Sequence, residues 1–266
     1  MEERDLAALW REEEDLAHIR GWDFSHIQGR YSGDAGLPWD YRQEVLERLR
    51  PEMKLLDVDT GGGEFLLSLG HPYDNTSATE AYPPNVCLCR RTLSPLGIDF
   101  RPEGEGGRLP FDAGTFDMVI DRHGSLHVPE IARVLKPGGI FVTEQVGAEN
   151  DRELVERLLG EIPLPFPEQY LEKAQRRCAD EGLTIRKGLE CFRPIRFYDV
   201  GALVWFARVV SWEFSGFSVA TCEDQLWEVQ RSLERDGCVE GRMHRFLLVT
   251  EKKNRGAPQS ERQKTA

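Results

Sequence analysis

The chain lacks several features that would tie it to a membrane or to an oxidising compartment. It contains no run of about 18 apolar residues, the length that a membrane-spanning helix requires, so we expect no membrane association. Its first residues are acidic, unlike the basic and apolar start of a secretory leader. The six cysteines are scattered, and without an export signal they predict reduced thiols and a cytoplasmic location.

Clusters of residues that would indicate a metal or a nucleic-acid partner are also missing. No His/Asp grouping has metal-ligand spacing, and Cys87 and Cys89 lack a partner pair, so they fit a buried helix face better than a metal site. Lys and Arg form no runs, and the net charge is −12. A negative field of this size disfavours binding to a phosphate backbone. We expect no metal and no nucleic-acid partner, while the sequence leaves the oligomeric state open.

The 266 residues suffice for one large domain with an appended cap. Residues 1–50 are predicted to form an N-terminal helical and aromatic cap, with helices near 2–20 and 42–50. Residues 51–251 are predicted to form the main domain, because strands and helices alternate from 54 to 145 as in a parallel sheet with crossover helices. The polar residues 252–266 are predicted to be a disordered tail.

The second half of the chain carries further helical and strand patterns. Apolar spacing predicts helices near 151–160, 168–181, 200–212 and 223–236. Alternating apolar residues predict strands at 184–191, 194–198 and 244–251.

A glycine-rich turn is the most informative motif. Residues 55–58 read as a strand, three glycines follow at 61–63, and an apolar helix comes next. Glycines let the backbone approach a ligand closely at the start of a helix. Glu80 closes the next predicted strand, where a carboxylate can accept from both hydroxyls of a ribose. Leu66 stands where a dinucleotide fingerprint needs its third glycine, which argues against a nicotinamide cofactor.

The rest of the first half narrows the interpretation. Leu109-Pro110-Phe111-Asp112 leads into an apolar strand at 115–121, and a helix ends in Lys136-Pro137-Gly138-Gly139 before a strand at 140–144. With these ordered motifs, residues 40–145 resemble the class I S-adenosylmethionine-dependent methyltransferases of the type 11 kind. The resemblance implies an α/β, Rossmann-like fold with a seven-stranded, mostly parallel sheet and helices on both faces. It also implies S-adenosylmethionine as the cofactor.

The resemblance carries functional roles to individual positions. It implies that Asp57 lies beneath the methionine amino group, that Glu80 binds the ribose and that Glu105 contacts the adenine. Asp121, Arg122 and His123 would face the transferred methyl group. Together the implied cofactor-binding residues are Asp57, Asp59, Thr60, Gly61, Gly63, Glu80, Ala81, Glu105 and Arg122.

Asp59 departs from the family pattern, which has its first loop glycine at this position. If the position requires a positive φ, aspartate is tolerated better than most residues but still at a cost. Its carboxylate could repel the methionine carboxylate or bond to the ammonium. A methyltransferase-like protein that is catalytically silent is therefore one alternative to an active enzyme.

Candidate catalytic groups follow the predicted strand that ends at Asp121. Methyl transfer from a sulfonium needs alignment more than acid–base chemistry, but a base assists a hydroxyl or protonated amine. His123 and His127 are the candidate bases, with Asp121 as a neighbour. Alternatively, His123 only lines the pocket and His127 only packs against or caps the following helix. The turn lacks the Asn/Asp-Pro-Pro-aromatic signature of the adenine and glutamine amino-methylases in this superfamily and the Pro-Cys pair of the cytosine C5 methylases.

Two aromatic segments are candidates for the acceptor site. The N-terminal aromatics either close over the pocket as a lid or cover the sheet edge and helix faces: Trp22, Phe24, His26, Tyr31, Trp39 and Tyr41. The segment 192–217 is expected to be core first, with one or two side chains lining a pocket. We predict methyl transfer to an oxygen or nitrogen atom of a small-molecule acceptor, with a silent protein or an RNA methyltransferase as the alternatives.

Overall fold

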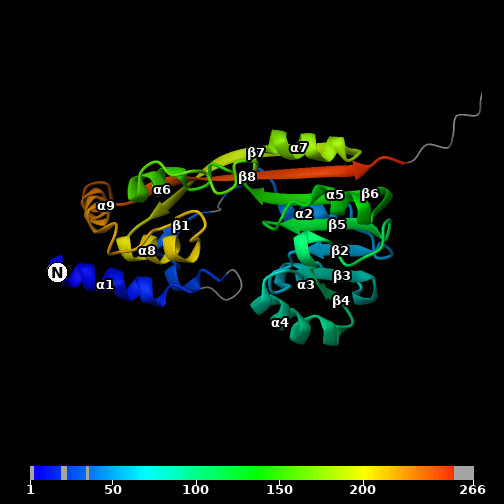
Figure 1. The fold of residues 1–266 in the computed structure, drawn as a ribbon, viewed down its shortest axis with the longest axis horizontal. Coiled ribbons are helices and arrows are strands. Elements are labelled where there is room, and N and C mark those ends of the chain that lie inside the picture. Colours follow the sequence, from blue (N-terminus) through cyan, green and yellow to red (C-terminus); the bar gives the residue numbers. More distant parts are fainter. Residues whose placement is uncertain (1–2, 19–22, 34–35, 255–266) are drawn as a thin grey trace, which may run out of the picture. The chain divides into compact units, whose positions relative to one another are not determined.

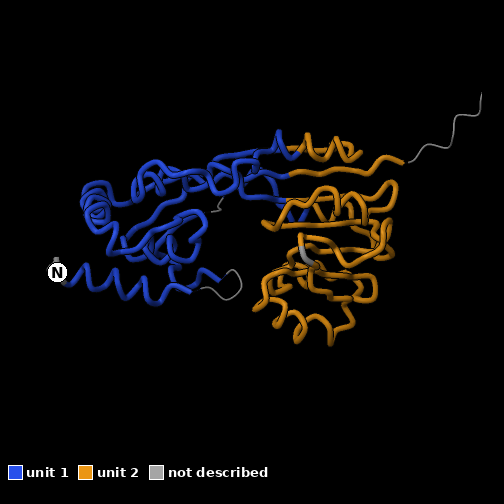
Figure 2. The backbone as a smooth tube through the Cα atoms, viewed as in Figure 1, with its two compact units in different colours: residues 1–43, 144–174, 189–247 blue, residues 44–143, 175–188, 248–266 orange. Residues whose placement is uncertain are grey.

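The computed structural model describes residues 3–18, 23–33 and 36–254. The chain divides into two compact units, which are coloured separately in Figure 2. Unit 1 comprises residues 1–43, 144–174 and 189–247, and unit 2 comprises residues 44–143, 175–188 and 248–266. The two units do not follow the predicted division of the chain at residues 50 and 251, because residues 1–43 group with 144–174 and 189–247. The domain boundaries therefore remain predictions.

Unit 2 carries the strands and helices of the glycine-turn region (Figure 1). Its strands are β2 (Leu55–Val58), β3 (Thr76–Glu80), β4 (Asp99–Pro102), β5 (Phe116–Arg122) and most of β6 (Leu135–Val146). Its helices are α3 (Glu64–Ser68), α4 (Pro83–Thr92), α5 (Val128–Val134) and most of α7 (Leu171–Asp180), with short 3-10 turns at Tyr73–Asn75, Ser94–Leu96 and Glu105–Gly107. Strand β2 is buried along its whole length, as expected for a parallel strand covered on both faces.

Unit 1 carries the remaining helices (Figure 1). These are α1 (Glu3–Leu16), a 3-10 turn at Ser25–Ile27, α6 (Arg152–Leu159), α8 (Val200–Val209) and α9 (Glu223–Asp236). It also contains β1 (Tyr31–Ser32) and parts of β7 (Leu183–Phe197) and β8 (Val239–Lys252). Helix α2 (Tyr41–Leu46) begins in unit 1 and ends in unit 2.

The sheet has the predicted α/β arrangement with one short strand more than the seven predicted. It has eight strands in the order β1-β7-β8-β6-β5-β2-β3-β4 and is mixed. β2 pairs in parallel with β3 and β5, and β3 pairs in parallel with β4, while β1 is antiparallel to β7. The extra strand β1 has only two residues, too few for a sequence pattern to mark. The two strands predicted at 184–191 and 194–198 are one continuous strand, β7.

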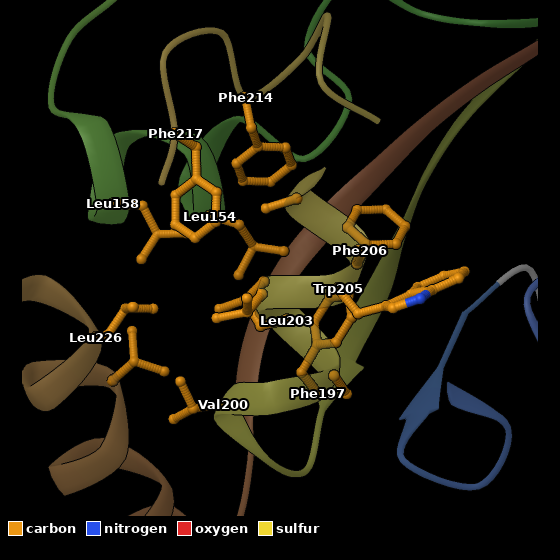
Figure 3. Packing of buried hydrophobic residues seen from close by; sticks show 14 of the residues in the cluster. Leu154, Leu158, Phe197, Val200, Leu203, Trp205, Phe206, Phe214, Phe217 and Leu226 are labelled. Carbon is orange, nitrogen blue, oxygen red and sulfur yellow. The ribbon is translucent and has the colours of Figure 1, made fainter. Parts of the chain in front are cut away.

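A single apolar cluster forms the core of unit 1, and Figure 3 shows how its side chains meet. Helix α8 contributes nearly all of its residues to this cluster, including the fully buried Leu203 and Trp205. Phe214 and Phe217 follow α8 and pack into the same cluster with Leu226 of α9. The prediction that the aromatic segment 192–217 is core holds for these residues.

The N-terminal aromatics are packed within unit 1. Phe24 and His26 both lie against Trp205, with the His26 ring stacked at a centroid distance of 5.3 Å. Trp39 is buried, and its Nε1 donates to Glu144 Oε2 at 2.6 Å. These contacts fit the covering role, while a lid remains a prediction; Trp22 lies outside the described residues. No helix among residues 3–18, 23–33 and 36–254 is long and apolar enough to cross a membrane.

Candidate functional site

Acidic residues gather where the parallel strands of unit 2 end. In the strand register Asp57 lies opposite Ala78 and Ile120, and Val58 lies opposite Asp121. Glu80 ends β3 opposite Pro102 of β4. Because carboxyl ends of parallel strands share one edge, these acids meet at one side of the sheet, where ligands bind in open α/β folds.

The glycine turn between β2 and α3 has the backbone that the sequence predicted. Gly61 and Gly63 have φ values of 65° and 86°, a region in which a side chain is strained. A methyl group on Gly63 would lie 2.7 Å from the Leu93 side chain, so the turn packs tightly against the residue that follows α4. Thr60 N donates to Thr79 O at 2.9 Å and ties the turn to β3.

Glu80 holds this turn and the start of α4 together. One carboxylate oxygen accepts from Gly61 N at 2.9 Å and from Asn85 Nδ2 at 3.2 Å. The other accepts from the backbone N–H groups of Ala81 and Tyr82, both at 2.8 Å. All four acceptor positions of the carboxylate are therefore used by protein donors. A ribose hydroxyl would replace one of them, and the bond from Asn85 is the longest.

Asp57 is buried beneath the turn. Its Oδ2 accepts from Thr60 Oγ1 at 2.6 Å, which places Thr60 beside Asp57 as part of the candidate site. Burial is the main cause that raises the pKa of Asp57 to about 7; Asp59 and Glu80 raise it further, and Arg122 opposes them. The Asp57 carboxyl therefore holds its proton to a higher pH than an exposed aspartate does.

Glu103 belongs to this site although the sequence interpretation passed over it. It follows β4 directly, its N donates to Glu80 O at 3.1 Å, and its Oε1 accepts from Thr79 Oγ1 at 2.9 Å. Burial raises its pKa to about 7, with the charges of Asp59 and Glu80 acting in the same direction. Glu105, chosen by counting back from Leu109, lies in a 3-10 turn, and its side chain falls outside the described residues. The position directly after the strand is the signal that would have found Glu103.

Asp59 adopts a positive φ, the backbone conformation in which aspartate is tolerated at a cost. Its φ is 51°, and its Oδ2 accepts from Ser125 N at 2.6 Å. Gly124 lies between two carboxylates: a methyl group there would be 2.6 Å from Asp59 Cβ and from Asp121 Oδ1. The loops after β2 and β5 therefore meet at Asp59.

The loop after β5 carries the candidate catalytic residues. Asp121 is fully buried, and its Oδ1 accepts from Gly124 N at 3.0 Å. Arg122 is exposed, and its guanidinium lies 5.6 Å from the centre of the Phe65 ring of α3. His123 is half-buried and has a φ of 62°, a strained backbone for a residue with a side chain. Strain of this kind occurs often at functional sites.

His127 lies further along the same loop, immediately before α5. It is exposed, it occupies the cap position of α5, and its side chain makes no capping hydrogen bond there. Its imidazole lies against Gly107, where a methyl group would be 2.5 Å from Nε2. The side chain of His127 therefore does not cap α5, and its ring lies against the 3-10 turn at Glu105–Gly107.

The charge of the site indicates the kind of ligand it can hold. Its acids are Asp57, Asp59, Glu80, Glu103 and Asp121, and Arg122 is the cation that acts on Asp57. Within the described ranges, no group of three or more His, Cys, Asp or Glu side chains is arranged to hold a metal ion. A cluster with this excess of carboxylates favours a cation over an anion near the glycine turn.

Comparison with known proteins agrees with these features. The family model of the methyltransferase domain matches residues 56–143. The phthiotriol/phenolphthiotriol dimycocerosates methyltransferase of Mycobacterium tuberculosis is 31% identical over 111 residues, 39% of this chain and 40% of the relative. The fatty-acid O-methyltransferase of Mycolicibacterium smegmatis is 30% identical over 116 residues, 41% of this chain and 42% of the relative. The chain thus matches about two fifths of the length of these curated relatives.

Solved structures show the same fold at low sequence identity. A protein from Bacillus halodurans C-125, provisionally assigned as a methyltransferase, has a TM-score of 0.57 and 15% identity over 81% of this chain and 99% of its own. The YcgJ protein of Bacillus subtilis has a TM-score of 0.54 and 18% identity over 80% of this chain and 98% of its own. Residues 56–143 therefore match a methyltransferase domain, and the chain shares the fold of these solved structures.

Proposed function

We propose that this protein uses S-adenosylmethionine to methylate a small-molecule acceptor. The observation that carries the proposal is a network of hydrogen bonds that connects the glycine turn to the acidic residues at one edge of the sheet. Gly61 donates to Glu80, Thr60 donates to Asp57, and Thr79 donates to Glu103. Three successive strand ends are thereby linked around a turn in which the backbone is open to a ligand.

The residues present fit this cofactor. Asp57 and Asp59 offer carboxylates to the methionine ammonium, and Gly61 and Gly63 leave room for the backbone to approach. Glu80, with Asn85 as its replaceable donor, would take the ribose hydroxyls. Glu103 is the acid we propose for the adenine side, in place of Glu105.

When bound, S-adenosylmethionine supplies an electrophilic methyl group on a sulfonium, and its transfer leaves the S–C electron pair on sulfur as a neutral thioether. The protein has to align the acceptor and to remove its proton. His123 is our candidate base, because it follows β5 directly and its strained backbone lies two residues from the bond between Ser125 and Asp59. Asp121 positions this loop through its bond from Gly124 N, and His127 is the second candidate base.

The acceptor class rests on the relatives. Two of them are named for methylation of a fatty acid and of 24-methylenesterol, the latter a C-methyltransferase. We propose a small-molecule acceptor, with oxygen or nitrogen as the acceptor atom, as the sequence suggested. An RNA substrate is disfavoured by the net charge of −12. The alternative of a catalytically silent protein rested on Asp59, and it is weakened because the Asp59 carboxylate accepts a hydrogen bond from Ser125 N.

The experiment is titration calorimetry with S-adenosylmethionine and S-adenosylhomocysteine, with NADH as a control. We expect micromolar binding of the adenosyl ligands alone. Glu80→Ala should weaken both by about 1–3 kcal/mol, since it removes charge-assisted hydrogen bonds. The exposed Glu172→Ala on α7 is the matched control. Circular dichroism establishes that each variant is folded, which matters because Glu80 also holds the turn.

Binding unchanged in folded Glu80→Ala would contradict the assigned ribose site. Binding of NADH in place of the adenosyl ligands would contradict the cofactor. With binding established, a screen of acceptors follows, in which His123→Ala should lower turnover while the affinity for S-adenosylmethionine stays nearly constant.

A further inference from the structure

Asp59 connects two loops of the candidate site. Its carboxylate accepts from Ser125 N at 2.6 Å, so the loop after β2 holds the loop after β5. The neighbouring Gly124 has no room for a side chain, because Asp59 Cβ lies 2.6 Å from the position a methyl group would take. A glycine at position 59 would lack both the carboxylate and this contact.

The charge of Asp59 also acts on two neighbouring acids, the buried Asp57 and the half-buried Glu103. For Glu103, burial is the main cause of a raised pKa and the charge of Asp59 is the next. For Asp57, burial again comes first, and Asp59 adds to it against the opposing bond from Thr60. The charge of Asp59 thus acts, together with that of Glu80, on both acids, of which Asp57 lies in β2 and Glu103 directly follows β4.

We propose that Asp59 is a specificity-determining residue that favours the cationic methyl donor over its neutral demethylated product. This inference rests on the proposed function. S-adenosylmethionine carries an ammonium, a carboxylate and a sulfonium, whereas S-adenosylhomocysteine lacks the sulfonium charge. A carboxylate added to the site attracts the former by a Coulomb term that the latter does not experience. The same residue, through Ser125 N, positions the loop that carries His123.

Charge and position can be separated by two variants. Asp59→Asn removes the charge but keeps an oxygen acceptor and a residue that tolerates a positive φ. Asp59→Gly removes the charge and the acceptor while relieving the backbone. Asp112→Asn, an exposed acid that precedes β5, serves as the matched control.

The first readout is the ratio of the dissociation constants of S-adenosylhomocysteine and S-adenosylmethionine at fixed ionic strength and pH. We expect both Asp59 variants to lower this ratio by about three- to tenfold, the effect of one unit charge at several ångströms in a partly hydrated site. Asp112→Asn should leave the ratio unchanged. The second readout is hydrogen exchange of the Ser125 amide, which should stay slow in Asp59→Asn and become faster in Asp59→Gly.

Two results would overturn the inference, and they differ in what else they affect. If Asp59→Asn weakens or strengthens both ligands equally, Asp59 does not discriminate between them, although the cofactor site stands. If neither adenosyl ligand binds the folded wild-type protein, the proposed function fails and the inference fails with it.

Discussion

Two carboxyls in the candidate site, the buried Asp57 and the half-buried Glu103, have pKa values raised toward neutrality, and this affects how stability responds to pH. Burial is the main reason why the pKa values of Asp57 and Glu103 are raised to about 7. In unit 1, burial likewise raises the pKa of Glu213 to about 8. In each case the folded protein holds a proton that the unfolded chain releases above its ordinary pKa near 4. The free energy of unfolding should therefore fall as pH rises from about 4.5 to 8.

Urea unfolding at several pH values measures this fall. Asp57→Asn and Glu213→Gln should each flatten part of the slope, because an amide does not titrate. The groups with a lowered pKa, such as Asp117 and Glu130, act below pH 4.5 and do not oppose the trend in this window. A free energy of unfolding that rises between pH 5 and 8 would contradict the burial assigned to these three carboxyls.

At the scale of elements, the start of α8 holds three segments of unit 1 together. The Asp199 carboxylate accepts from Ala202 N at 2.8 Å and caps this apolar helix. Arg30 donates to both oxygens of Asp199, at 2.6 and 2.9 Å, and to Glu13 of α1 at 2.7 Å. Arg30, which precedes β1, therefore links Glu13 of α1 to Asp199 at the start of α8.

We expect Asp199→Ala to lower the free energy of unfolding by about 1–3 kcal/mol, since it removes a cap and a bidentate partner of Arg30. Asp199→Asn keeps a capping oxygen and should cost less. Asp180→Ala, an exposed acid at the end of α7, should change stability by less than about 0.5 kcal/mol. Equal losses from Asp199→Ala and Asp180→Ala would show that the capping network contributes nothing measurable. Urea unfolding provides the comparison.

Local patterns were sufficient for some elements and failed for others. The helix predicted at 223–236 is α9 with the same bounds, because its apolar spacing and its final glycine act locally. The strand, glycine turn and helix at 55–68 also form as predicted. β7 was predicted as two strands, yet it is continuous through Pro194, a residue that cannot donate to a strand ladder. Tertiary pairing, which a local pattern does not contain, decides that outcome.

Some residues of the candidate site could likewise be predicted from local sequence order, and others could not. Gly61, Gly63, Asp57 and Glu80 follow from the order of strand, turn and acid, and the structure brings them together. Glu103 was missed because the count from Leu109 crosses a 3-10 turn whose length no pattern fixes. The bond from Ser125 to Asp59 joins residues 66 positions apart, so only the fold reveals that the departure at Asp59 has a partner.

The whole molecule carries a net charge of −12. A negative protein draws a cation toward itself and repels a phosphate backbone. The acids of the candidate site have the same sign as the molecule as a whole, so local and global fields add for a sulfonium ligand.

This addition predicts a salt dependence that differs between two nearly identical ligands. Salt shortens the Debye length from about 30 Å at 0.01 M to about 8 Å at 0.15 M, which removes the distant charges first. The dissociation constant of S-adenosylmethionine should rise by about two- to fivefold over this range, while that of neutral S-adenosylhomocysteine stays nearly constant. Calorimetry at several KCl concentrations measures both. A parallel change in the two constants would mean that salt acts on the fold or on the carboxylate and ammonium that the ligands share. Since Asp59→Asn removes only one near charge, this variant should keep most of the salt dependence, which separates the global field from the local one.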